Sequence, residues 1–323
     1  MTPARIMVVR LSAMGDILHA LPAVASLKAS FPEARITWAV KPRWASLLGQ
    51  NPHVDRVWPV EAPDWLFRSG RFDLAIDFQG LVQSALVART CRPRRLLGFD
   101  YPLLRERAAG LFYSERGTSA AAHVVDRNLD LAAAAGAAQR IIEFPLPDCA
   151  PEGRLPDSDF LLASPGAGWR SKQWPPDHYA RLAGLVRQRF GWPLVLNCAP
   201  PELAAAEAIA RQAPPGAVLV NASSVAGLIG ATRRARGVIG VDSGPLHLAA
   251  ALRRPGVALF GPTDPARNGP YGDTFTVLRA PGALTTYQRE NHYSPSMLAI
   301  RPEQVVEALE ARLARRPVLE STR

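Results

Sequence analysis

One stretch in the C-terminal half constrains the fold of this chain more than any other. Residues 238–241 (Val-Ile-Gly-Val) form a short, β-branched apolar run, which is typical of a buried strand. The next four residues, Asp-Ser-Gly-Pro, combine good helix N-caps with a proline that the first helical turn tolerates. An apolar helix is then predicted over 246–252, and a Pro-Gly pair ends it before a second apolar run at 257–260. This order of strand, turn, helix and strand is a βαβ crossover, which predicts a parallel sheet.

The turn of this crossover also suits an anion. A helix N-terminus carries free N–H groups and positive partial charge, and here it lies at the carboxyl end of a predicted parallel strand. Gly244 would let a ligand approach the backbone closely, and His247 lies in the first turn of the helix. The structural alternative is an ordinary crossover in which the Ser-Gly-Pro turn only caps the helix, and the turn alone favours neither interpretation.

Bulk properties place the chain among two-domain α/β proteins. Its 323 residues suffice for two domains, 48% of them are hydrophobic, and strand patterns alternate with helix patterns. A proline-rich segment at 145–158 is typical of an interdomain linker. We therefore predict an N-terminal domain over 1–150 and a C-terminal domain over 151–323. A last helix is expected over 301–316, and packing of this helix back on the first domain is one option.

Cysteine content, hydropathy and charge indicate a cytoplasmic protein with anionic partners. The three cysteines are widely spaced without a C-x-x-C pair, which suits a reducing compartment and argues against a zinc cluster. No signal peptide precedes the first apolar strand, and no uncharged apolar run is long enough to cross a bilayer. The net charge of +10 favours anionic partners, although the arginine bias of a GC-rich genome explains part of it. Nucleic acid is disfavoured because the chain lacks the usual basic helices and RNA-binding motifs.

Two further turns carry candidate site residues. Arg-Leu-Ser-Ala-Met-Gly-Asp at 10–16 follows the first strand and places Asp16 at the start of a helix predicted over 17–30. Asp16 is either an N-cap worth about 1 kcal/mol of helix stability or a carboxylate that accepts a proton from a substrate hydroxyl. Lys172 ends a glycine-containing loop at 164–172, where a phosphate contact and a merely solvated lysine are the alternatives. Neither turn is G-x-G-x-x-G, which disfavours a dinucleotide oxidoreductase.

Four segments, taken in order, resemble the lipopolysaccharide heptosyltransferases of glycosyltransferase family 9. They are Met-Gly-Asp-Ile-Leu-His at 14–19, Asp-Phe-Gln-Gly-Leu-Val-Gln-Ser-Ala at 77–85, Lys-Gln-Trp-Pro at 172–175, and Val-Asp-Ser-Gly-Pro-Leu-His-Leu-Ala at 241–249 with Gly-Pro-Thr-Asp-Pro at 261–265. The resemblance covers nearly the whole chain and implies the GT-B fold, in which two Rossmann-like domains face each other across a cleft. The segments at 77–80, 105–113 and 172–175 are most similar to heptosyltransferase I, which adds the first heptose to Kdo in the inner core of lipid A.

The resemblance implies an inverting transfer of L-glycero-D-manno-heptose from ADP-heptose to Kdo-lipid A, without a metal or cofactor. Asp16 is the implied catalytic base, and Lys172 the implied ligand of the donor diphosphate. The other implied donor-binding residues are Asp242, Ser243, Gly244, His247, Ala167, Gly168, Glu202 and Ser223, and the implied acceptor-binding residues are Ser12, Gly15 and Arg105. Ala167 and Gly168 stand where the family often has hydroxyl residues, so backbone N–H groups would have to bind phosphate there.

The membrane-anchored acceptor and the basic first domain further imply peripheral association with the anionic face of the inner membrane. Three alternatives stay open. A later-acting heptosyltransferase and a transferase of another sugar belong to the same family. A non-catalytic nucleotide-sugar-binding protein is the third, and the presence of Asp16 disfavours it.

Overall fold

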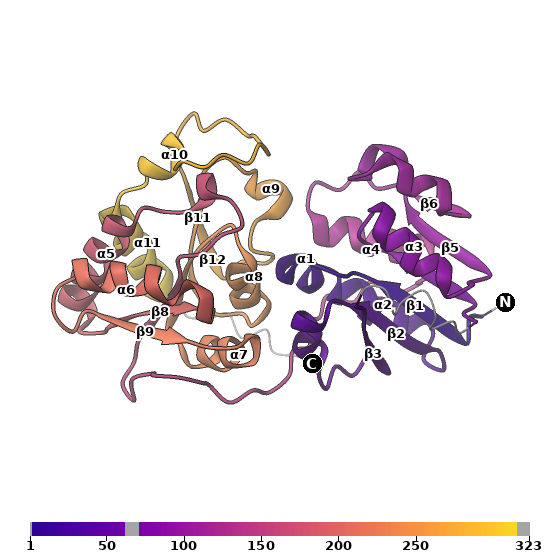
Figure 1. Cartoon of the computed structure of the whole chain (residues 1–323), viewed down its shortest axis with the longest axis horizontal. Helices are drawn as coiled ribbons and strands as arrows, with labels where there is room; N and C mark the ends of the chain where they lie inside the picture. Colours follow the sequence, from indigo (N-terminus) through magenta and orange to yellow (C-terminus); the bar gives the residue numbers. More distant parts are fainter. Residues whose placement is uncertain (1, 62–70, 315–323) are drawn as a thin grey trace. The chain divides into compact units, whose positions relative to one another are not determined.

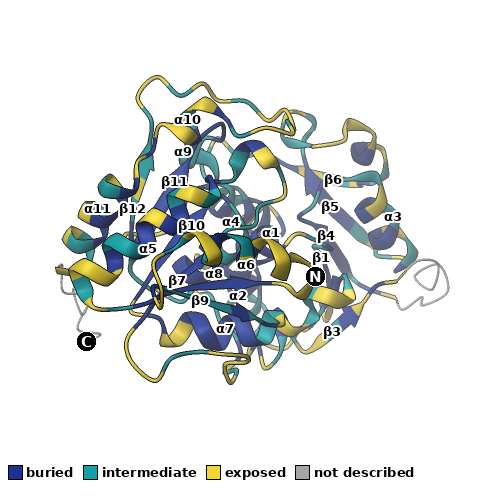
Figure 2. Ribbon diagram, turned by 60° about the vertical axis from the view of Figure 1, so that its left-hand side comes forward, coloured by how far each residue is buried: buried dark blue, intermediate teal, exposed yellow. Residues whose placement is uncertain are grey.

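The computed structural model describes residues 2–61 and 71–314, and the chain divides into two compact units, Met1–Pro147 and Asp148–Arg323. Each unit holds a six-stranded parallel sheet with helices around it (Figure 1). The central strands of both sheets are almost completely buried, whereas the outer strands are only partly buried (Figure 2). Burial on both faces is what a parallel sheet requires, and it explains why most of the strand sequences are continuous apolar runs.

The sheet of the first unit has the strand order β3-β2-β1-β4-β5-β6. Its strands are β1 (Arg5–Val9), β2 (Arg35–Val40), β3 (Arg56–Pro59), β4 (Leu74–Asp77), β5 (Arg95–Phe99) and β6 (Glu115–Gly117). Its helices are α1 (Met14–Leu18), α2 (Leu21–Ser30), α3 (Val82–Thr90) and α4 (Val124–Ala134), with 3-10 turns η1 (Pro42–Leu48), η3 (Tyr101–Leu103) and η4 (Arg107–Phe112). α2 packs against α4, whereas α3 packs against β1 and β4.

The helix predicted over 17–30 is two helices in the structure. α1 ends at Leu18, and α2 begins at Leu21 with Pro22 in its first turn. In an unbroken helix the proline would remove a hydrogen bond and clash with the preceding turn, whereas at a helix start its missing N–H is harmless. Pro22 therefore explains why the second helix begins only at Leu21.

The sheet of the second unit has the order β12-β11-β10-β7-β8-β9. Its strands are β7 (Leu161–Ser164), β8 (Leu194–Cys198), β9 (Val218–Ala222), β10 (Gly237–Val241), β11 (Gly256–Phe260) and β12 (Phe275–Arg279). Its helices are α5 (Pro176–Phe190), α6 (Leu203–Gln212), α7 (Val225–Arg234), α8 (Gly244–Ala251), α9 (Pro265–Asn268), α10 (Pro295–Leu298) and α11 (Pro302–Ala314), with 3-10 turns η5 (Arg170–Lys172) and η6 (Pro200–Glu202). The predicted βαβ crossover is confirmed as β10, α8 and β11, whose strands pair in parallel.

The two sheets share one topology. Numbered within its own unit, each runs 3-2-1-4-5-6, the order of the Rossmann fold. All strands are parallel, but the order in which the chain adds strands to the sheet reverses between the first and fourth strands. These are β1 and β4 in the first unit and β7 and β10 in the second. Ligands of such sheets bind at the carboxyl ends of these two strands.

The last helix belongs to the second unit. α11 packs against α5, β11 and β12, and Val305 and Leu309 on it are fully buried in the core of that unit. Residues 315 and 316, the end of the predicted helix, lie outside the described residues. Within the described ranges, none of the helices has both the length and the apolar character needed to cross a membrane.

Candidate active site

The predicted donor-binding residues gather at the carboxyl ends of four neighbouring strands of the second unit, β10, β7, β8 and β9. Lys172 ends the loop after β7, and Asp242 directly follows β10. Glu202 lies in η6 after β8, and Ser223 directly follows β9. The strand order thus brings together residues that are far apart in the sequence, with Lys172 and Asp242 at the topological reversal point.

Lys172 and Asp242 form a buried ion pair. Lys172 Nζ lies 2.7 Å from Asp242 Oδ2, and the two side chains are only 15% and 5% exposed. His247 Nε2 lies 3.5 Å from the other carboxylate oxygen, Oδ1. Burial alone would raise the pKa of Asp242, but the hydrogen bond from His247 and the charge of Lys172 together hold that pKa well below its usual value. Asp242 is therefore a stable anion that fixes the position of the Lys172 ammonium.

The ion pair places a positive charge beside a helix N-terminus. Asp242 is two residues before Gly244, the first residue of α8, so the ammonium of Lys172 and the positive end of the helix dipole lie together. Ser243 occupies the N-cap position, but its side chain makes no capping hydrogen bond. Its buried Oγ has no hydrogen-bond partner among residues 2–61 and 71–314. The purely capping interpretation of this turn thus lacks its main bond, whereas the anion-binding interpretation has a lysine and a helix end.

The loop after β7 is shaped by contact with Glu202. A Cβ atom on Gly166 would lie 2.5 Å from Glu202 Oε1, so glycine at this position lets the carboxylate stand where it does. Glu202 is exposed, and its Oε2 accepts a hydrogen bond from the N–H of Ala199 at 3.0 Å. Ala167 is half-buried against the core, whereas Gly168 is exposed with open space around its Cα. The exposed carboxylate next to this loop suits a polar ligand.

The hydroxyl of Ser223 is held inside the protein. Its side chain is 7% exposed, and its Oγ donates to Asn197 Oδ1 at 3.0 Å. Asn221 donates to the same oxygen at 2.8 Å. The hydroxyl of Ser223 is therefore engaged in a buried polar cluster between β8 and β9, which the sequence pattern did not predict.

Sequence analysis missed the aromatic residue that accompanies Lys172. Lys172 Nζ lies 4.8 Å from the centre of the Trp169 ring, and the Arg289 guanidinium carbon lies 5.6 Å from it. Cation–aromatic contacts of this length restrict a flexible lysine. Trp174 anchors the same loop, because it is buried and its Nε1 donates to the carbonyl of Ile300 at 3.0 Å. A tryptophan within a glycine-containing loop was the available signal.

In the first unit, Asp16 lies on the turn after β1. It is the third residue of α1, not its N-cap, and its Oδ2 accepts the N–H of the N-cap residue Ala13 at 3.1 Å. Arg10 Nη2 lies 2.7 Å from the other oxygen, Oδ1. The side chain of Asp16 is 39% exposed, so a hydroxyl group can approach a carboxylate whose orientation is already set.

A buried carboxylate supports this turn from the neighbouring strand. Asp77, the last residue of β4, is fully buried, and its Oδ2 accepts from Ser84 Oγ and Tyr113 Oη at 2.7 Å each. Its Oδ1 accepts the backbone N–H of Gln79 at 2.8 Å. Burial raises the pKa of Asp77 although these hydrogen bonds oppose the rise. The Gln79 side chain in turn reaches back to the turn that holds Asp16, accepting the N–H of Leu11 at 2.7 Å.

The predicted acceptor-binding residues lie on both sides of this arrangement. Ser12 is half-buried on the turn, and Gly15 is buried in α1. Arg105 is exposed, and its backbone runs beside Gly80: a Cβ on Gly80 would lie 3.8 Å from the Arg105 nitrogen. Gly80 has a φ of +70°, which glycine adopts without strain. Arg105 thus lies near the end of β4, and β4 pairs with β1, the strand that leads to Asp16.

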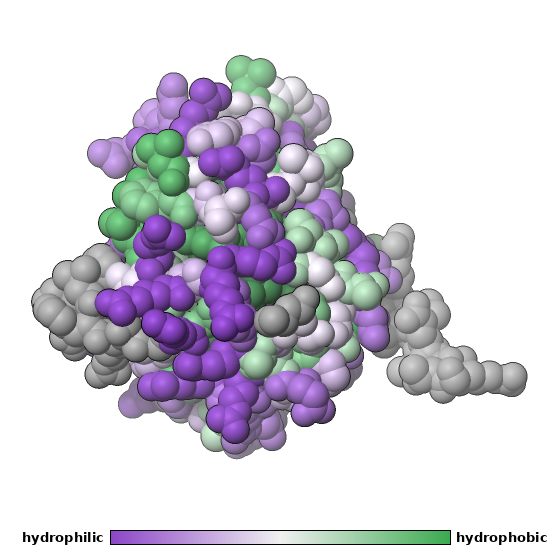
Figure 3. Space-filling model, turned by 90° about the vertical axis from the view of Figure 1, so that its right-hand side faces the viewer, coloured by the Kyte–Doolittle hydropathy of each residue, from purple (hydrophilic) through white to green (hydrophobic). Residues whose placement is uncertain are grey.

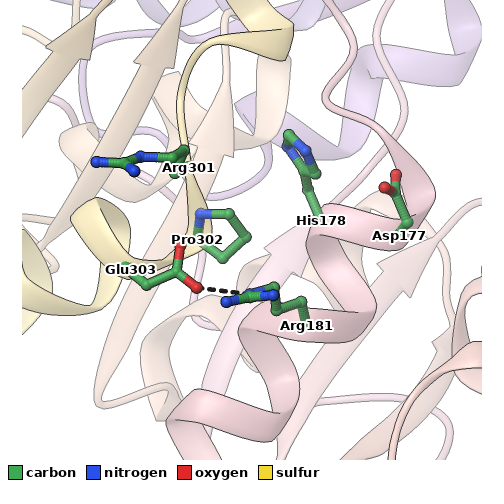
Figure 4. A pocket seen from close by; sticks show the side chains of 6 residues that line it. All are labelled: Asp177, His178, Arg181, Arg301, Pro302 and Glu303. Carbon is green, nitrogen blue, oxygen red and sulfur yellow. Dashed lines mark hydrogen bonds and ion pairs between the residues drawn. The ribbon is translucent and has the colours of Figure 1, made fainter.

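A separate cavity of about 570 Å³ contains none of these candidates (Figure 4). It is lined by Asp177, His178, Arg181, Arg301, Pro302 and Glu303, at the first turns of α5 and α11. Arg181 Nε lies 2.5 Å from Glu303 Oε1, and this ion pair neutralises the charges of both side chains in the lining. The cavity is therefore no candidate for the donor site. In the part of the chain that is described, no group of three or more His, Cys, Asp or Glu residues could hold a metal ion.

Two Rossmann-like units, one with a cation at a helix N-terminus and one with an exposed carboxylate, are the elements of a GT-B glycosyltransferase. The model of glycosyltransferase family 9 (heptosyltransferase) matches residues 66–295, and the chain belongs to this family. It is 32% identical to lipopolysaccharide heptosyltransferase 1 of Pseudomonas aeruginosa over 83% of this chain and 81% of that protein. It is 31% identical to lipopolysaccharide heptosyltransferase 1 of Escherichia coli, over 86% of this chain and 94% of that protein.

A solved structure leads to the same conclusion. The E. coli heptosyltransferase WaaC with ADP superposes with a TM-score of 0.77 and 27% identity, covering 95% of this chain and 99% of that one. The predicted GT-B fold class and the predicted membership of the heptosyltransferase family are confirmed. The protein is accordingly a glycosyltransferase.

Proposed function

We propose that this protein transfers L-glycero-D-manno-heptose from ADP-heptose to the Kdo part of the lipid A inner core, with inversion at the sugar. The observation that carries the proposal is the Lys172–Asp242 pair at the N-terminus of α8, because it is a built site for a diphosphate. The similarity to proteins named lipopolysaccharide heptosyltransferase 1 supports the choice of the first heptose over later ones.

On the donor side, the second unit holds the nucleotide. Lys172 and the N-terminus of α8 stabilise the negative charge that develops on the departing ADP, since both are in place before the reaction begins. Asp242 keeps Lys172 in position, and His247 orients Asp242. Ala167 and Gly168 contribute backbone N–H groups to the phosphates, and Glu202 binds nucleotide hydroxyls. Ser223, bonded to Asn197, supports the part of the donor site that holds the nucleobase.

On the acceptor side, Asp16 is the general base. It takes the proton of a Kdo hydroxyl while that oxygen forms a bond to the anomeric carbon and the bond from this carbon to the diphosphate oxygen breaks. Ser12, Gly15 and Arg105 bind the acceptor, and the exposed guanidinium of Arg105 suits its negative charges.

No metal is assigned a part, because Lys172 and the helix end supply positive charge at the diphosphate. The acceptor is membrane-anchored, so we place the enzyme in the cytoplasm, bound peripherally to the anionic face of the inner membrane. Arg43, Arg56 and Arg71 of the first unit are exposed and available for such contact. Figure 3 shows one face of the molecule, on which hydrophilic side chains gather in the centre and lower part and more apolar ones lie above and beside them.

The decisive experiment incubates the protein with ADP-heptose and Kdo-lipid A and identifies the product by mass spectrometry. We expect one heptose on Kdo and release of ADP. A panel of acceptors that already carry heptose, and of other nucleotide sugars, tests the later-acting and other-sugar alternatives. Turnover with none of these donors and acceptors, together with intact ADP binding, would instead support a non-catalytic nucleotide-sugar-binding protein.

A further inference from the structure

The side-chain amide of Gln79 uses its oxygen, Oε1, in hydrogen bonds, whereas its NH₂ group makes none within the described residues. Gln79 follows β4 at the topological reversal point of the first sheet. Its Oε1 accepts the backbone N–H groups of Leu11 at 2.7 Å and Ser12 at 3.3 Å. Because both partners are donors, the oxygen has to face them, and this assignment directs the NH₂ group to the opposite side.

The NH₂ group of Gln79 is available to a ligand. The residue is half-buried, and within residues 2–61 and 71–314 no oxygen accepts a hydrogen bond from Nε2. Nε2 is also not among the buried polar atoms that lack a partner, so solvent reaches it. Its backbone is held as well, since the N–H of Gln79 donates to the buried Asp77 at 2.8 Å. Two donor hydrogens are therefore presented from a fixed support.

Gln79 and Asp16 hold the same turn. Ser12 and Ala13 are consecutive residues: the N–H of Ser12 binds Gln79 Oε1, and the N–H of Ala13 binds Asp16 Oδ2. Arg10 links the same two segments, because one guanidinium nitrogen lies 2.7 Å from Asp16 and the other donates to the carbonyl of Phe78. The candidate base Asp16 and the amide of Gln79 are thus hydrogen-bonded to the backbone of one turn.

We infer that Gln79 is an acceptor-binding residue, whose NH₂ group donates to an oxygen of the anionic acceptor sugar next to the hydroxyl that Asp16 deprotonates. The inference rests on the proposed function, which identifies Asp16 as the base. A neutral donor with a fixed direction selects an oxygen at one place and so sets which hydroxyl of a polyhydroxylated sugar meets the carboxylate.

The test is Gln79→Glu, which keeps an oxygen for Leu11 and Ser12 and replaces the NH₂ group by an acceptor. Binding of a Kdo disaccharide to the full chain in the presence of ADP is measured by titration calorimetry. We expect the Kd for the disaccharide to rise at least about tenfold, because a donor is lost and a like charge faces the ligand. The Kd for ADP and the melting temperature should stay at the wild-type values.

Two more variants separate binding from folding. Gln83→Glu makes the same charge change on α3, where Gln83 is exposed, and should alter neither Kd. Gln79→Met removes both the donor and the support of the turn, so it should weaken disaccharide binding and also lower kcat. If Gln79→Glu binds the disaccharide as tightly as the wild type does, Gln79 only supports the turn and the inference is overturned.

The proposed function can fail separately. If the wild type binds the disaccharide, Gln79→Glu does not, and no heptose is transferred, the proposed reaction is wrong while the assignment of Gln79 stands. If the wild type itself does not bind the disaccharide, the acceptor class is wrong and the inference falls with it.

Discussion

At the scale of single residues, the site is built from side chains that have partners before any ligand arrives. Asp16 is held by Arg10 and by a backbone N–H, and Lys172 is held by Asp242. Holding a group in one orientation lowers the entropy that a reaction or a binding event must remove. The pairs also predict different losses on substitution, because Asp16 is partly exposed whereas Asp242 is buried.

Asp16→Asn should lower heptose transfer by about 10²–10⁴-fold, since an amide cannot accept the proton from the acceptor hydroxyl. The Kd for ADP should not change, because the donor candidates lie in the second unit. Steady-state kinetics with ADP-heptose and ADP titration measure the two quantities. Asp157→Asn, at an exposed aspartate, is the control. Loss of ADP binding in parallel with transfer would contradict the assignment of Asp16 as the base.

Lys172→Met should weaken ADP binding and also destabilise the fold at pH 7, by about 3–5 kcal/mol if the pair behaves like other buried ion pairs. The contrast is Lys28→Met, which breaks a more exposed pair with Asp55 and should cost about 0–1 kcal/mol. Unchanged ADP affinity in Lys172→Met would remove Lys172 from the donor site.

The stability difference between the wild type and Lys172→Met should shrink in acid. The folded-state pKa of Asp242 lies below the ordinary value of 3.8, so its stabilising contribution is present above that value and lost as the pH falls further. Without Lys172, only the interactions with His247 oppose the effect of burial on the pKa of Asp242, so this source of acid sensitivity is smaller. Melting temperatures of the two proteins are measured at pH 7 and at pH 3. The difference between wild type and Lys172→Met should be smaller at pH 3. A constant difference would show that Asp242 does not carry the effect.

At the scale of elements, the sequence predicts where strands and helices lie along the chain better than it predicts which strands are neighbours in the sheet. The apolar runs predicted at 238–241 and 257–260 became β10 and β11, and the helix predicted over 246–252 became α8, with each boundary within two residues. β6 and β12 are missed because short edge strands with charged residues lack the buried pattern. The partnership of Lys172 with Asp242 could not be predicted either, since it depends on β7 lying beside β10, and nothing local encodes that order.

The support of the base-bearing turn depends on a glycine in β5. A Cβ on Gly98 would lie 2.2 Å from the ring of Tyr113, the residue whose hydroxyl binds Asp77 at 2.7 Å. Gly98→Ala should therefore displace Tyr113 and lower the melting temperature by several degrees, as overpacking of about 1–3 kcal/mol does. Gly49→Ala, where the nearest atom is 3.4 Å away, is the matched control in the same unit. Equal melting temperatures for the two variants would contradict this packing argument.

At the scale of the whole molecule, the same topology is used twice for two different tasks. In each unit the candidates lie at the carboxyl ends of the first and fourth strands, with Asp16 and Gln79 in one unit and Lys172 and Asp242 in the other. Proton transfer and leaving-group stabilisation are thereby assigned to separate units. Because the two proposed tasks belong to residues of different units, kcat and ADP affinity should respond to different substitutions.

The net charge of +10 predicts salt-dependent membrane association of the intact protein. Sedimentation with vesicles containing anionic lipid should carry down most of the protein at low ionic strength and little of it at 0.5 M NaCl. Vesicles of neutral lipid are the control and should bind little at either salt concentration. Binding that does not depend on salt would refute an electrostatic association with the membrane surface.

The contact between Gly166 and Glu202 has a consequence for engineering and for evolutionary change. Because a Cβ at position 166 would lie 2.5 Å from Glu202 Oε1, a larger residue there would displace this carboxylate. Glu202 is exposed, so its flexible side chain can turn into solvent at little cost to the fold. The glycine at 166 therefore sets where the carboxylate stands, and a substitution at 166 would redirect Glu202 without removing it.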